Sequence, residues 1–471
     1  MQLNEWLILK QELLLVAIIL GILLIWLWKE PSNEVWINGM NLVLLLNMVG
    51  GLVELNYGSL FGGSFVTSPL IIAEKTILNL AVWIISLFSY DWCKKAVNLP
   101  EFYLLLITSL LGMFLMLSAQ NLLLFYLGLE MASLPLAAVV GFDFGKRHSP
   151  EAAMKLVITS AFSSALLLLG ISWLYGLTGT LDYAGLINHV GHSPISILAF
   201  LLILSGFAFK ISAVPFHLWT ADVYQGAPTA VTAFLSVVSK SAVLMVMIPL
   251  LYQTFEEKID VWYPGILLLA LASILIANFF AIRQLHLKRL LAFSSIAQVG
   301  FLLIGLSANT REGATSVIYF LLIYLFSNLA AFGVVSVLSA QHGKEEISDL
   351  SGMYTTNPFL SWILTISLFS LAGIPPTAGF FGKFFLLLSG ATSGNYWLIG
   401  IAAANMVISL FYYLKVVKTI FMNQPINPLP RVHLSPSVKF ALLFCVMGIV
   451  VVGFMGSFYE HLFQLLNGIN Q

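Results

Sequence analysis

The feature that most constrains this sequence is a succession of long apolar runs with few charged residues between them. Hydrophobic residues make up 59% of the 471 positions and charged residues only 9%, whereas soluble domains carry roughly 25% charged residues. A helix that crosses a bilayer needs about 20 apolar residues at a rise of about 1.5 Å each. We therefore expect an all-α, polytopic membrane protein with no soluble domain.

The apolar runs predict about fourteen transmembrane helices. They cover residues 12–28, 36–56, 72–90, 100–118, 120–140, 151–175, 195–222, 227–253, 262–282, 289–308, 314–340, 357–390, 396–420 and 438–464. The third run has the least defined start, because Gly62, Gly63 and Pro69 precede it. The first run is not followed by a small-residue cleavage site, so we expect it to be retained rather than removed as a signal peptide.

Positive charges predict how these helices are oriented. If the N-terminus lies outside, the inner loops hold Lys29, Lys94, Lys95, Lys146, Arg147, Arg283, Lys288, Arg289, Lys344, Lys415, Lys418 and Arg431. The outer loops then hold only Lys10, Lys258 and Arg311. Because Lys and Arg favour the cytoplasmic side, this imbalance predicts that both termini face the outer, periplasmic side.

Two of the predicted helices contain residues that break a helix. Residues 195–222 include Pro215, and residues 357–390 include Gly373 and the pair Pro375 and Pro376. Proline removes a backbone donor and clashes with the preceding turn, so helices 7 and 12 should be discontinuous at mid-depth. Such backbone survives in a bilayer only where protein or water satisfies it. Two ordinary proline kinks are the alternative interpretation.

The distance between the two breaks predicts an internal repeat. The breaks lie an odd number of helices apart, which places the matching elements in opposite orientations, as in inverted repeats. We expect four parts: residues 1–98 with helices 1–3, residues 99–255 with the first repeat (helices 4–8), residues 256–422 with the second, inverted repeat (helices 9–13), and residues 423–471 with helix 14.

A small set of ionisable residues falls inside the apolar runs. They are Glu130, Lys155, Lys210, Lys240 and Lys383, and each costs about 2.5–3.5 kcal/mol at a helix centre. A lysine withdrawn from water holds its proton less tightly, and an approaching carboxylate reverses that effect. Buried amines that interact with Glu130 can therefore load and release protons near neutral pH.

Other polar residues extend this predicted proton path. His217 lies at the first break and can pass protons near neutral pH. Ser294, Ser295 and Gln298 lie in the run 289–308 and can hold water between the charged groups. The sequence thus predicts a chain of protonatable and hydrated groups through the membrane.

Each of these residues also has a structural interpretation. Lys155 follows Pro150 closely and can extend to the membrane interface, and His217 can be a packed, hydrogen-bonded histidine. Lys210, Lys240 and Lys383 can belong to buried structural ion pairs. We expect Glu74 and Lys75 to be interfacial, and Asp222 to cap a segment or pair with a lysine.

The sequence contains no motif for electron or nucleotide chemistry. It has no glycine-rich nucleotide loop between a strand and a helix, and Cys93 and Cys445 lie far apart without a metal-ligand spacing. We therefore expect no cofactor, no metal and no nucleic-acid partner for this chain.

Three stretches resemble one known family over most of the chain. Residues 210–229 (KISAVPFHLWTADVYQGAPT) and 288–300 (KRLLAFSSIAQVG) resemble the antiporter-like subunits of respiratory complex I, which are similar to Mrp-type sodium/proton antiporters. Residues 372–384 (AGIPPTAGFFGKF) are similar to helix 12 of the N subunit, where the M subunit typically has glutamate instead of Lys383. Lys155 matches a helix 6 lysine of the N subunit, whereas Gln298 replaces a histidine of some relatives.

The resemblance implies a proton-translocating membrane subunit of NADH:quinone oxidoreductase in a bacterial inner membrane. It implies that Glu130 and Lys210 form the interacting pair of a first half-channel, that Lys240 is the central carrier and that Lys383 ends the second half-channel. Lys155 and His217 would lie along the path.

The resemblance also implies partners. Flavin, iron–sulfur clusters and quinone would belong to other subunits, and this chain would contact the M subunit, small membrane subunits and lipid. Two alternatives remain open: a subunit of an Mrp-type antiporter, and a structural membrane subunit with no proton path.

Overall fold

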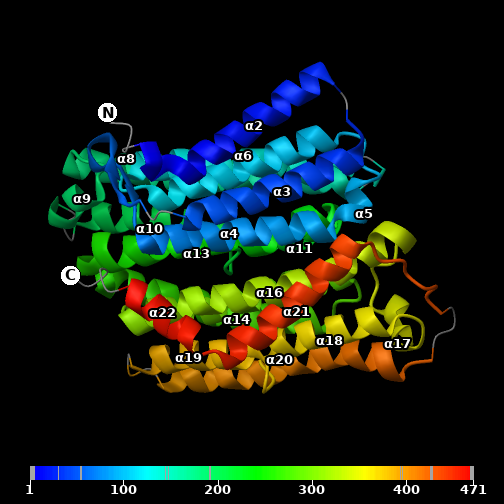
Figure 1. Cartoon of the computed structure of the whole chain (residues 1–471). Helices are drawn as coiled ribbons and strands as arrows, with labels where there is room; N and C mark the ends of the chain where they lie inside the picture. The colour runs from blue at the N-terminus through cyan, green and yellow to red at the C-terminus, as the bar shows by residue number, and fades with distance from the viewer. Residues whose placement is uncertain are drawn as a thin grey trace.

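The computed structural model describes residues 6–29, 31–53, 56–143, 145–146, 148–189, 193–392, 394, 396–424 and 428–466. It is a bundle of long helices that run side by side (Figure 1). Among the described residues, 12 helices are long and apolar enough to cross a membrane. The predicted all-α, polytopic membrane fold is thus confirmed. Arg147, one of the residues expected in the inner loops, lies outside the described residues.

Most of the predicted spans correspond to single long helices. These are α2 (Lys10–Trp28, preceded by η1, Leu7–Leu9), α3 (Asn33–Leu52), α4 (Pro69–Phe88), α6 (Leu99–Ser118), α7 (Leu122–Val140), α8 (His148–Thr178), α14 (Ile259–Ile282), α15 (Leu287–Ser307), α16 (Arg311–His342), α20 (Tyr396–Met422) and α21 (Pro436–Phe454). The span Thr229–Thr254 is composite. It consists of α12 (Thr229–Ala233), η3 (Phe234–Ser239), α13 (Lys240–Pro249) and η4 (Leu250–Thr254).

The two proline-containing spans are each divided into two shorter helices. The first consists of α10 (Pro194–Lys210) and α11 (Leu218–Gly226), and the second of α18 (Pro358–Ala372) and α19 (Ala378–Thr392). The total of about fourteen spans, the inverted repeat and the four-part division stay predictions.

Short elements connect the long helices. They are β1 (Gly58–Leu60), η2 (Phe61–Gly63), β2 (Phe65–Thr67), α5 (Tyr90–Cys93), α9 (Tyr183–His189), η5 (Glu256–Lys258), η6 (Ser348–Leu350), α17 (Met353–Thr356) and α22 (Ser457–Leu465).

A small β-hairpin defines the start of the third span. β1 pairs antiparallel with β2, and Gly62 and Gly63 adopt φ values of 68° and 93° between them, a region that favours glycine. The side chain of Ser68 then caps α4 by accepting a hydrogen bond from the Ile71 amide. The hairpin thus ends immediately before α4 begins.

Glu74 and Lys75 are covered by protein, and whether they lie at the depth of the membrane interface stays a prediction. Both residues lie inside α4, and their exposed fractions are 4% and 0%. The ring of Phe65, from β2, lies over the Lys75 ammonium with its centroid 5.3 Å away. The sequence did not indicate this burial, because the contact with the hairpin is tertiary.

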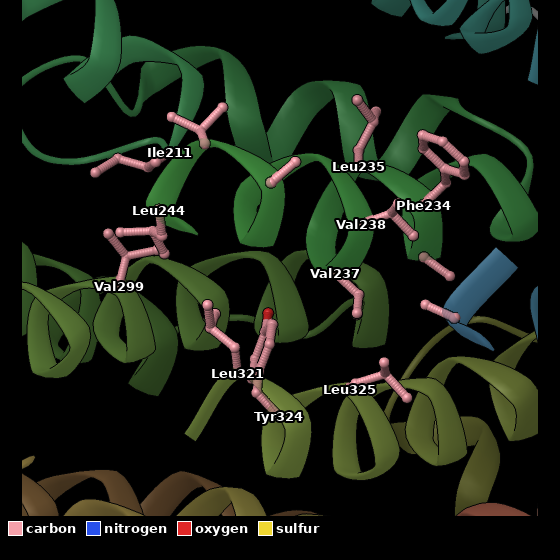
Figure 2. Packing of buried hydrophobic residues seen from close by; sticks show 14 of the residues in the cluster. Ile211, Phe234, Leu235, Val237, Val238, Leu244, Val299, Leu321, Tyr324 and Leu325 are labelled. Carbon is pink, nitrogen blue, oxygen red and sulfur yellow. The ribbon is translucent and has the colours of Figure 1, made fainter. Parts of the chain in front are cut away.

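The centre of the bundle is formed by the span Thr229–Thr254, α15 and α16, which are almost entirely buried. Figure 2 shows Leu244 of this span close to Val299 of α15, and Val237 on the part of the span that faces Tyr324 of α16, whose hydroxyl points toward η3. η3 is a π-helical turn directly before Lys240, and such turns are rare and often occur at functional sites. This packing places Lys240 in the interior.

The basic loops gather at one end of the bundle. Lys95 donates a hydrogen bond to the carbonyl of Ala340 (3.2 Å), and Lys146 forms an ion pair with Glu345 (3.1 Å). The start of α2 and the helix α22 both lie at the opposite end (Figure 1). Which end faces the cytoplasm stays a prediction.

Candidate functional site

The first break lies between Lys210, the last residue of α10, and Leu218, the first of α11. Between them Ser212 adopts a left-handed φ of 62°. The freed backbone amide of Val214 donates to the hydroxyl of Ser273 on α14, at 2.9 Å. The protein itself therefore satisfies backbone that lipid cannot.

Lys210 is held by neutral oxygen atoms. Its ammonium donates to the hydroxyls of Ser133 on α7 (2.7 Å) and Ser160 on α8 (2.9 Å). Glu130 accepts instead from Ser164 on α8, at 2.5 Å. Lys210 and Glu130 interact electrostatically, but among the described residues they form no direct ion pair. Glu130 and Lys210 thus lie near each other, as expected, but each is bound by serine hydroxyls rather than by the other.

A small cavity borders the Lys210 ammonium. It has a volume of about 30 Å³, and its lining includes Ser133, Ser160, Lys210, Trp219 and Ser239. Leu136, Leu156, Phe209 and Leu235 complete the lining, and the cavity has room for about one water molecule beside its polar groups. Since Ser239 directly precedes Lys240, the cavity extends from the first break toward the central lysine.

Lys155 lies apart from the buried amines. Its side chain is 42% exposed and forms ion pairs with Glu151 and Asp222, both at 2.8 Å. Asp222 also binds Arg289, with a nitrogen-to-oxygen distance of 2.7 Å. This agrees with the alternative that Lys155 extends to the interface, and with the expectation that Asp222 pairs with a lysine.

His217 lies at the N-terminus of α11 and is 7% exposed. The His217 ring interacts with the Pro215 backbone, and the Nε1 atom of Trp219 is buried without a hydrogen-bond partner among the described residues. Buried polar atoms of this kind are usually satisfied by water. His217 also interacts electrostatically with Lys240. The histidine therefore lies at the first break and within electrostatic range of the central lysine.

Lys240 lies between the two halves of the bundle. It is 2% exposed, and its ammonium donates to Ser295 of α15 at 2.9 Å. One turn earlier, the Ser236 hydroxyl contacts the Tyr324 hydroxyl (2.9 Å) and accepts from the Asn328 amide (2.7 Å), both on α16. The central lysine thus has neutral polar neighbours.

Lys383 caps the second break. α18 ends at Ala372, and Gly373 follows with a left-handed φ of 83°. The buried Lys383 ammonium reaches back from α19 to the carbonyls of Leu371 (2.7 Å) and Ala372 (3.4 Å). A helix C-terminus leaves carbonyls without intrahelical partners and attracts cations. The broken helix thereby supplies the binding site for the lysine.

Close backbone contact at this break requires a glycine. A Cβ atom on Gly379 would lie 1.7 Å from the carbonyl oxygen of Ser370. The Gly379 amide donates to the Ser370 hydroxyl at 3.2 Å. Glycine at this position therefore lets α19 start against the end of α18.

Polar residues of α15 lie between Lys240 and Lys383. Ser295 binds Lys240, and Gln298 donates to the same Leu371 carbonyl that binds Lys383, at 2.9 Å. Ser294 and Gln298 both contact the Tyr413 hydroxyl, at 2.5 and 3.3 Å. These side chains lie where the sequence suggested.

Several site residues were not identified from the sequence. Ser133 follows Glu130 by three residues, and Ser160 and Ser164 are four residues apart, so hydroxyls at helical spacing were a usable signal. Tyr413 and Asn328 gave no such signal, because their partners are distant in sequence. Among the residues that the structure describes, no group of three or more His, Cys, Asp or Glu side chains could hold a metal ion.

Comparisons with known proteins place the chain in one family. The family described as "NADH:quinone oxidoreductase/Mrp antiporter, TM" matches residues 119–409. A protein named NADH-quinone oxidoreductase subunit N from Azobacteroides pseudotrichonymphae is 40% identical over 481 residues, which covers 100% of both chains. A protein of the same name from Phocaeicola vulgatus is 40% identical and covers 95% of this chain and 96% of its own.

Two solved structures have a similar fold. A chain of respiratory complex I from Thermus thermophilus superposes with a TM-score of 0.82 at 26% identity, and the match covers 95% of this chain and 97% of that one. A chain of the Mrp complex from Dietzia superposes with a TM-score of 0.89 at 19% identity, over 99% and 97% of the two chains. The latter likeness concerns the fold alone.

Proposed function

Because this chain belongs to the NADH:quinone oxidoreductase/Mrp antiporter transmembrane family, we propose that it translocates protons as the N subunit of a respiratory NADH:quinone oxidoreductase. Relatives of that name match it at 40% identity over nearly their whole length. The likeness to the Mrp complex, at 19% identity, supports an antiporter role only weakly. The chain works as part of a translocase and assembles with other complex I subunits.

One observation carries the proposal: three buried amines are held by neutral oxygen atoms. Lys210 and Lys240 bind serine hydroxyls, and Lys383 binds backbone carbonyls. A carboxylate in direct contact would keep the proton on each amine and would itself be orphaned if the proton left. With neutral partners, an amine can release its proton without leaving a buried anion. This argues against structural ion pairs at these three positions.

We assign Glu130 the role of a switch for Lys210. Ser160 binds Lys210 and Ser164 binds Glu130, and these serines lie one turn apart on α8. A rotation of the Glu130 side chain can therefore bring the carboxylate toward the ammonium. A close carboxylate favours the protonated lysine, and a distant one favours release.

In this proposal the proton moves from Lys210 toward Lys240 and then Lys383. The small cavity between Lys210 and Ser239, with His217 nearby, supports the first transfer. Ser295, Ser294, Tyr413 and Gln298 support the second. Lys155, with its ion pair to Asp222, would deliver protons from the membrane surface.

The proposal includes a location and partners. The protein would lie in a bacterial inner membrane with both termini on the outer side, next to the antiporter-like M subunit and small membrane subunits. Flavin, iron–sulfur and quinone chemistry would take place in other subunits. The four-part division with two inverted repeats, residues 99–255 and 256–422, belongs to the same proposal.

The test is Lys240→Met in the assembled complex reconstituted into lipid vesicles. We expect the number of protons moved per quinone reduced to fall clearly, because methionine fills similar space without a protonatable group. Lys94→Met is a matched control, since the Lys94 ion pair with Glu34 lies at the surface with side chains 56% and 52% exposed. If Lys240→Met assembles normally and its proton transport is unchanged, the proposed proton path would be wrong and a structural role for this chain would remain.

The same vesicles test the antiporter alternative. Proton translocation is measured with sodium present and with sodium replaced by choline. We expect no difference for a redox-driven proton pump. A strict requirement for sodium would favour the antiporter function over the one proposed.

A further inference from the structure

A groove that is both basic and apolar lies on the outer face of α20, which runs along the edge of the bundle (Figure 1). It has a volume of about 620 Å³, within the range of about 300–1,000 Å³ that ligand pockets have. Its lining residues all belong to α20, and they are Phe411, Leu414, Lys415, Val417, Lys418, Phe421 and Met422. Two ammonium groups thus border an apolar surface.

The inner face of α20 is fixed by contacts with the rest of the bundle. The Tyr412 hydroxyl donates to the Asn278 side chain of α14 at 3.1 Å, and the Asn278 amide donates to the Asn405 side chain at 3.3 Å. Buried positions recur every three or four residues from Leu398 to Ile420, which is the pattern of one buried face of a helix. The groove therefore lies on the face that points away from the bundle.

The protein does not neutralise the two lysines of the groove. Lys415 and Lys418 are exposed, and neither side chain forms an ion pair or a hydrogen bond with the described residues. The helices α17, α18 and α19 pack against α20 and contain no acidic residue. On η6, which also packs against α20, Asp349 is paired with Lys344 at 2.8 Å. The positive charge of the groove is therefore available to an anion from outside the chain.

Aromatic side chains place the groove at the level of lipid headgroups. The Phe421 ring centroid lies 4.8 Å from that of Tyr354 on α17 and 5.3 Å from that of Trp362 on α18. Tyr354 and Trp362 are 40% and 51% exposed, and these residue types are enriched where a membrane meets water. Lys415 and Lys418 lie within about the last two turns of α20. Their long side chains can therefore extend along the apolar surface to the headgroups.

The remainder of the groove requires hydrocarbon. Phe411, Leu414 and Met422 are 59%, 41% and 74% exposed, and Val407, toward the middle of α20, is 69% exposed. A small water-soluble anion would leave these side chains uncovered. A phospholipid supplies both parts, because its phosphate accepts hydrogen bonds from ammonium groups and its acyl chains cover the apolar surface.

We propose that this groove binds an anionic phospholipid, with the phosphate at Lys415 and Lys418 and the acyl chains along Phe411 and Leu414. Clusters of basic residues at the end of a transmembrane helix attract anionic lipids. A zwitterionic lipid carries its own cation beside the phosphate, so the two lysines favour the anionic class. The site stands apart from the proton path and does not depend on the proposed function.

The test compares two photoactivatable lipids in the assembled complex. The complex is reconstituted into phosphatidylcholine vesicles that contain a small amount of either phosphatidylglycerol or phosphatidylcholine with a diazirine in one acyl chain. After irradiation, crosslinks to residues 407–422 are quantified by mass spectrometry. We expect the anionic probe to label this segment at least about fivefold more than the neutral probe, because each lysine near the surface attracts the anionic headgroup.

Three double variants separate charge from general lipid contact. Lys415→Gln/Lys418→Gln should be labelled equally by both probes, whereas Lys415→Arg/Lys418→Arg should keep the preference for the anionic probe. Lys94→Gln/Lys95→Gln is the matched control. It removes the same charge from the basic end of the bundle, where Lys94 pairs with Glu34 and Lys95 binds a carbonyl, and it should also keep the preference.

Three results would overturn the proposal. Equal labelling of the wild type by both probes would show an ordinary lipid-facing surface. Absence of labelling by either probe would show that a neighbouring subunit covers the groove. A preference that persists in Lys415→Gln/Lys418→Gln would assign anion binding to other residues. The first two results come from the wild type, so they hold even if a variant does not assemble.

Discussion

The two helix breaks each present a buried lysine, but to different partners. At the first break, Lys210 binds two serine hydroxyls from neighbouring helices, with Glu130 close but not in contact. At the second break, Lys383 binds two carbonyls of the helix that has just ended. Hydroxyls rotate and a carboxylate can approach, whereas backbone carbonyls are fixed. The electrostatic environment of Lys210 can therefore change, whereas that of Lys383 stays constant.

The largest expected effect comes from removing the adjustable amine. In Lys210→Met we expect the rate of proton translocation through this subunit to fall at least about tenfold, which corresponds to about 1.4 kcal/mol or more in the barrier. Vesicle assays of proton uptake and quinone reduction measure it. Lys95→Met, which removes an exposed lysine bound to the Ala340 carbonyl, serves as control. If Lys210→Met and Lys95→Met transport protons equally well, Lys210 is not needed for transport and the proposed difference between the two breaks is wrong.

Lys383→Met should combine a smaller transport defect with a loss of stability. The Leu371 carbonyl would keep the Gln298 amide as a donor, but the Ala372 carbonyl would lose its ammonium donor. An unsatisfied buried acceptor costs about 1–3 kcal/mol. Thermal unfolding of the purified complex should therefore start at a lower temperature than in Lys210→Met. The reverse order would show that the second break is not held by its lysine.

A cluster of charged residues around Glu345 lies outside both breaks, so we expect it to affect stability but not transport. Burial raises the pKa of Glu345. The hydrogen bond from His286 and the charges of Lys288 and Lys146 outweigh this effect and hold the pKa of Glu345 well below its usual range. Because the folded pKa is lowered, its stabilisation is present above the ordinary pKa of about 4.3 and is lost as pH falls.

Glu345→Gln should therefore destabilise the protein by about 1–3 kcal/mol at pH 7. The difference from the wild type in thermal unfolding should stay nearly constant from pH 7 to about pH 5 and shrink as the pH falls below about 4.3, while proton transport by the assembled complex at pH 7 stays normal. A constant difference at all pH values would contradict this charge assignment.

Neutralising the switch should have a moderate effect on transport. Glu130→Gln keeps a side chain that can bond to Ser164 but removes the charge that acts on Lys210. We expect transport to fall about fivefold, or about 1 kcal/mol in the barrier. Glu312→Gln, near the start of α16, is the control. If Glu130→Gln transports normally, the difference between the breaks does not depend on a carboxylate.

The smallest effect should come from a single hydroxyl. Ser160→Ala removes one of two hydroxyl partners of Lys210, so Ser133 still holds the ammonium. We expect a decrease of about twofold in transport rate and normal assembly. A loss as large as that of Lys210→Met would mean that the site is rigid rather than adjustable.

The sequence was sufficient to find both breaks and the buried lysines. Proline, glycine and charge stand out against an apolar background, so Pro215, Gly373, Lys210, Lys240 and Lys383 were visible without any structure. These features are local, because they depend on the composition of a single span. The positions of the divided helices followed from them directly.

What the sequence did not provide depends on contacts between distant segments. The burial of Lys75 requires Glu12 and the hairpin ring of Phe65, and the separation of Glu130 from Lys210 requires two serines of α8. No spacing pattern specifies which of two nearby charges makes contact. For the same reason, the exposure of Lys155 could not be decided from Pro150 alone.

The most direct test of the central claim is replacement of Lys210, Lys240 and Lys383 by arginine, one at a time. Arginine keeps the positive charge but cannot release its proton in a protein. If these amines transfer protons, each arginine variant should assemble yet move fewer protons per quinone reduced, as the methionine variants do. Native proton stoichiometry in the arginine variants would contradict the account, because it would show that a fixed charge is sufficient.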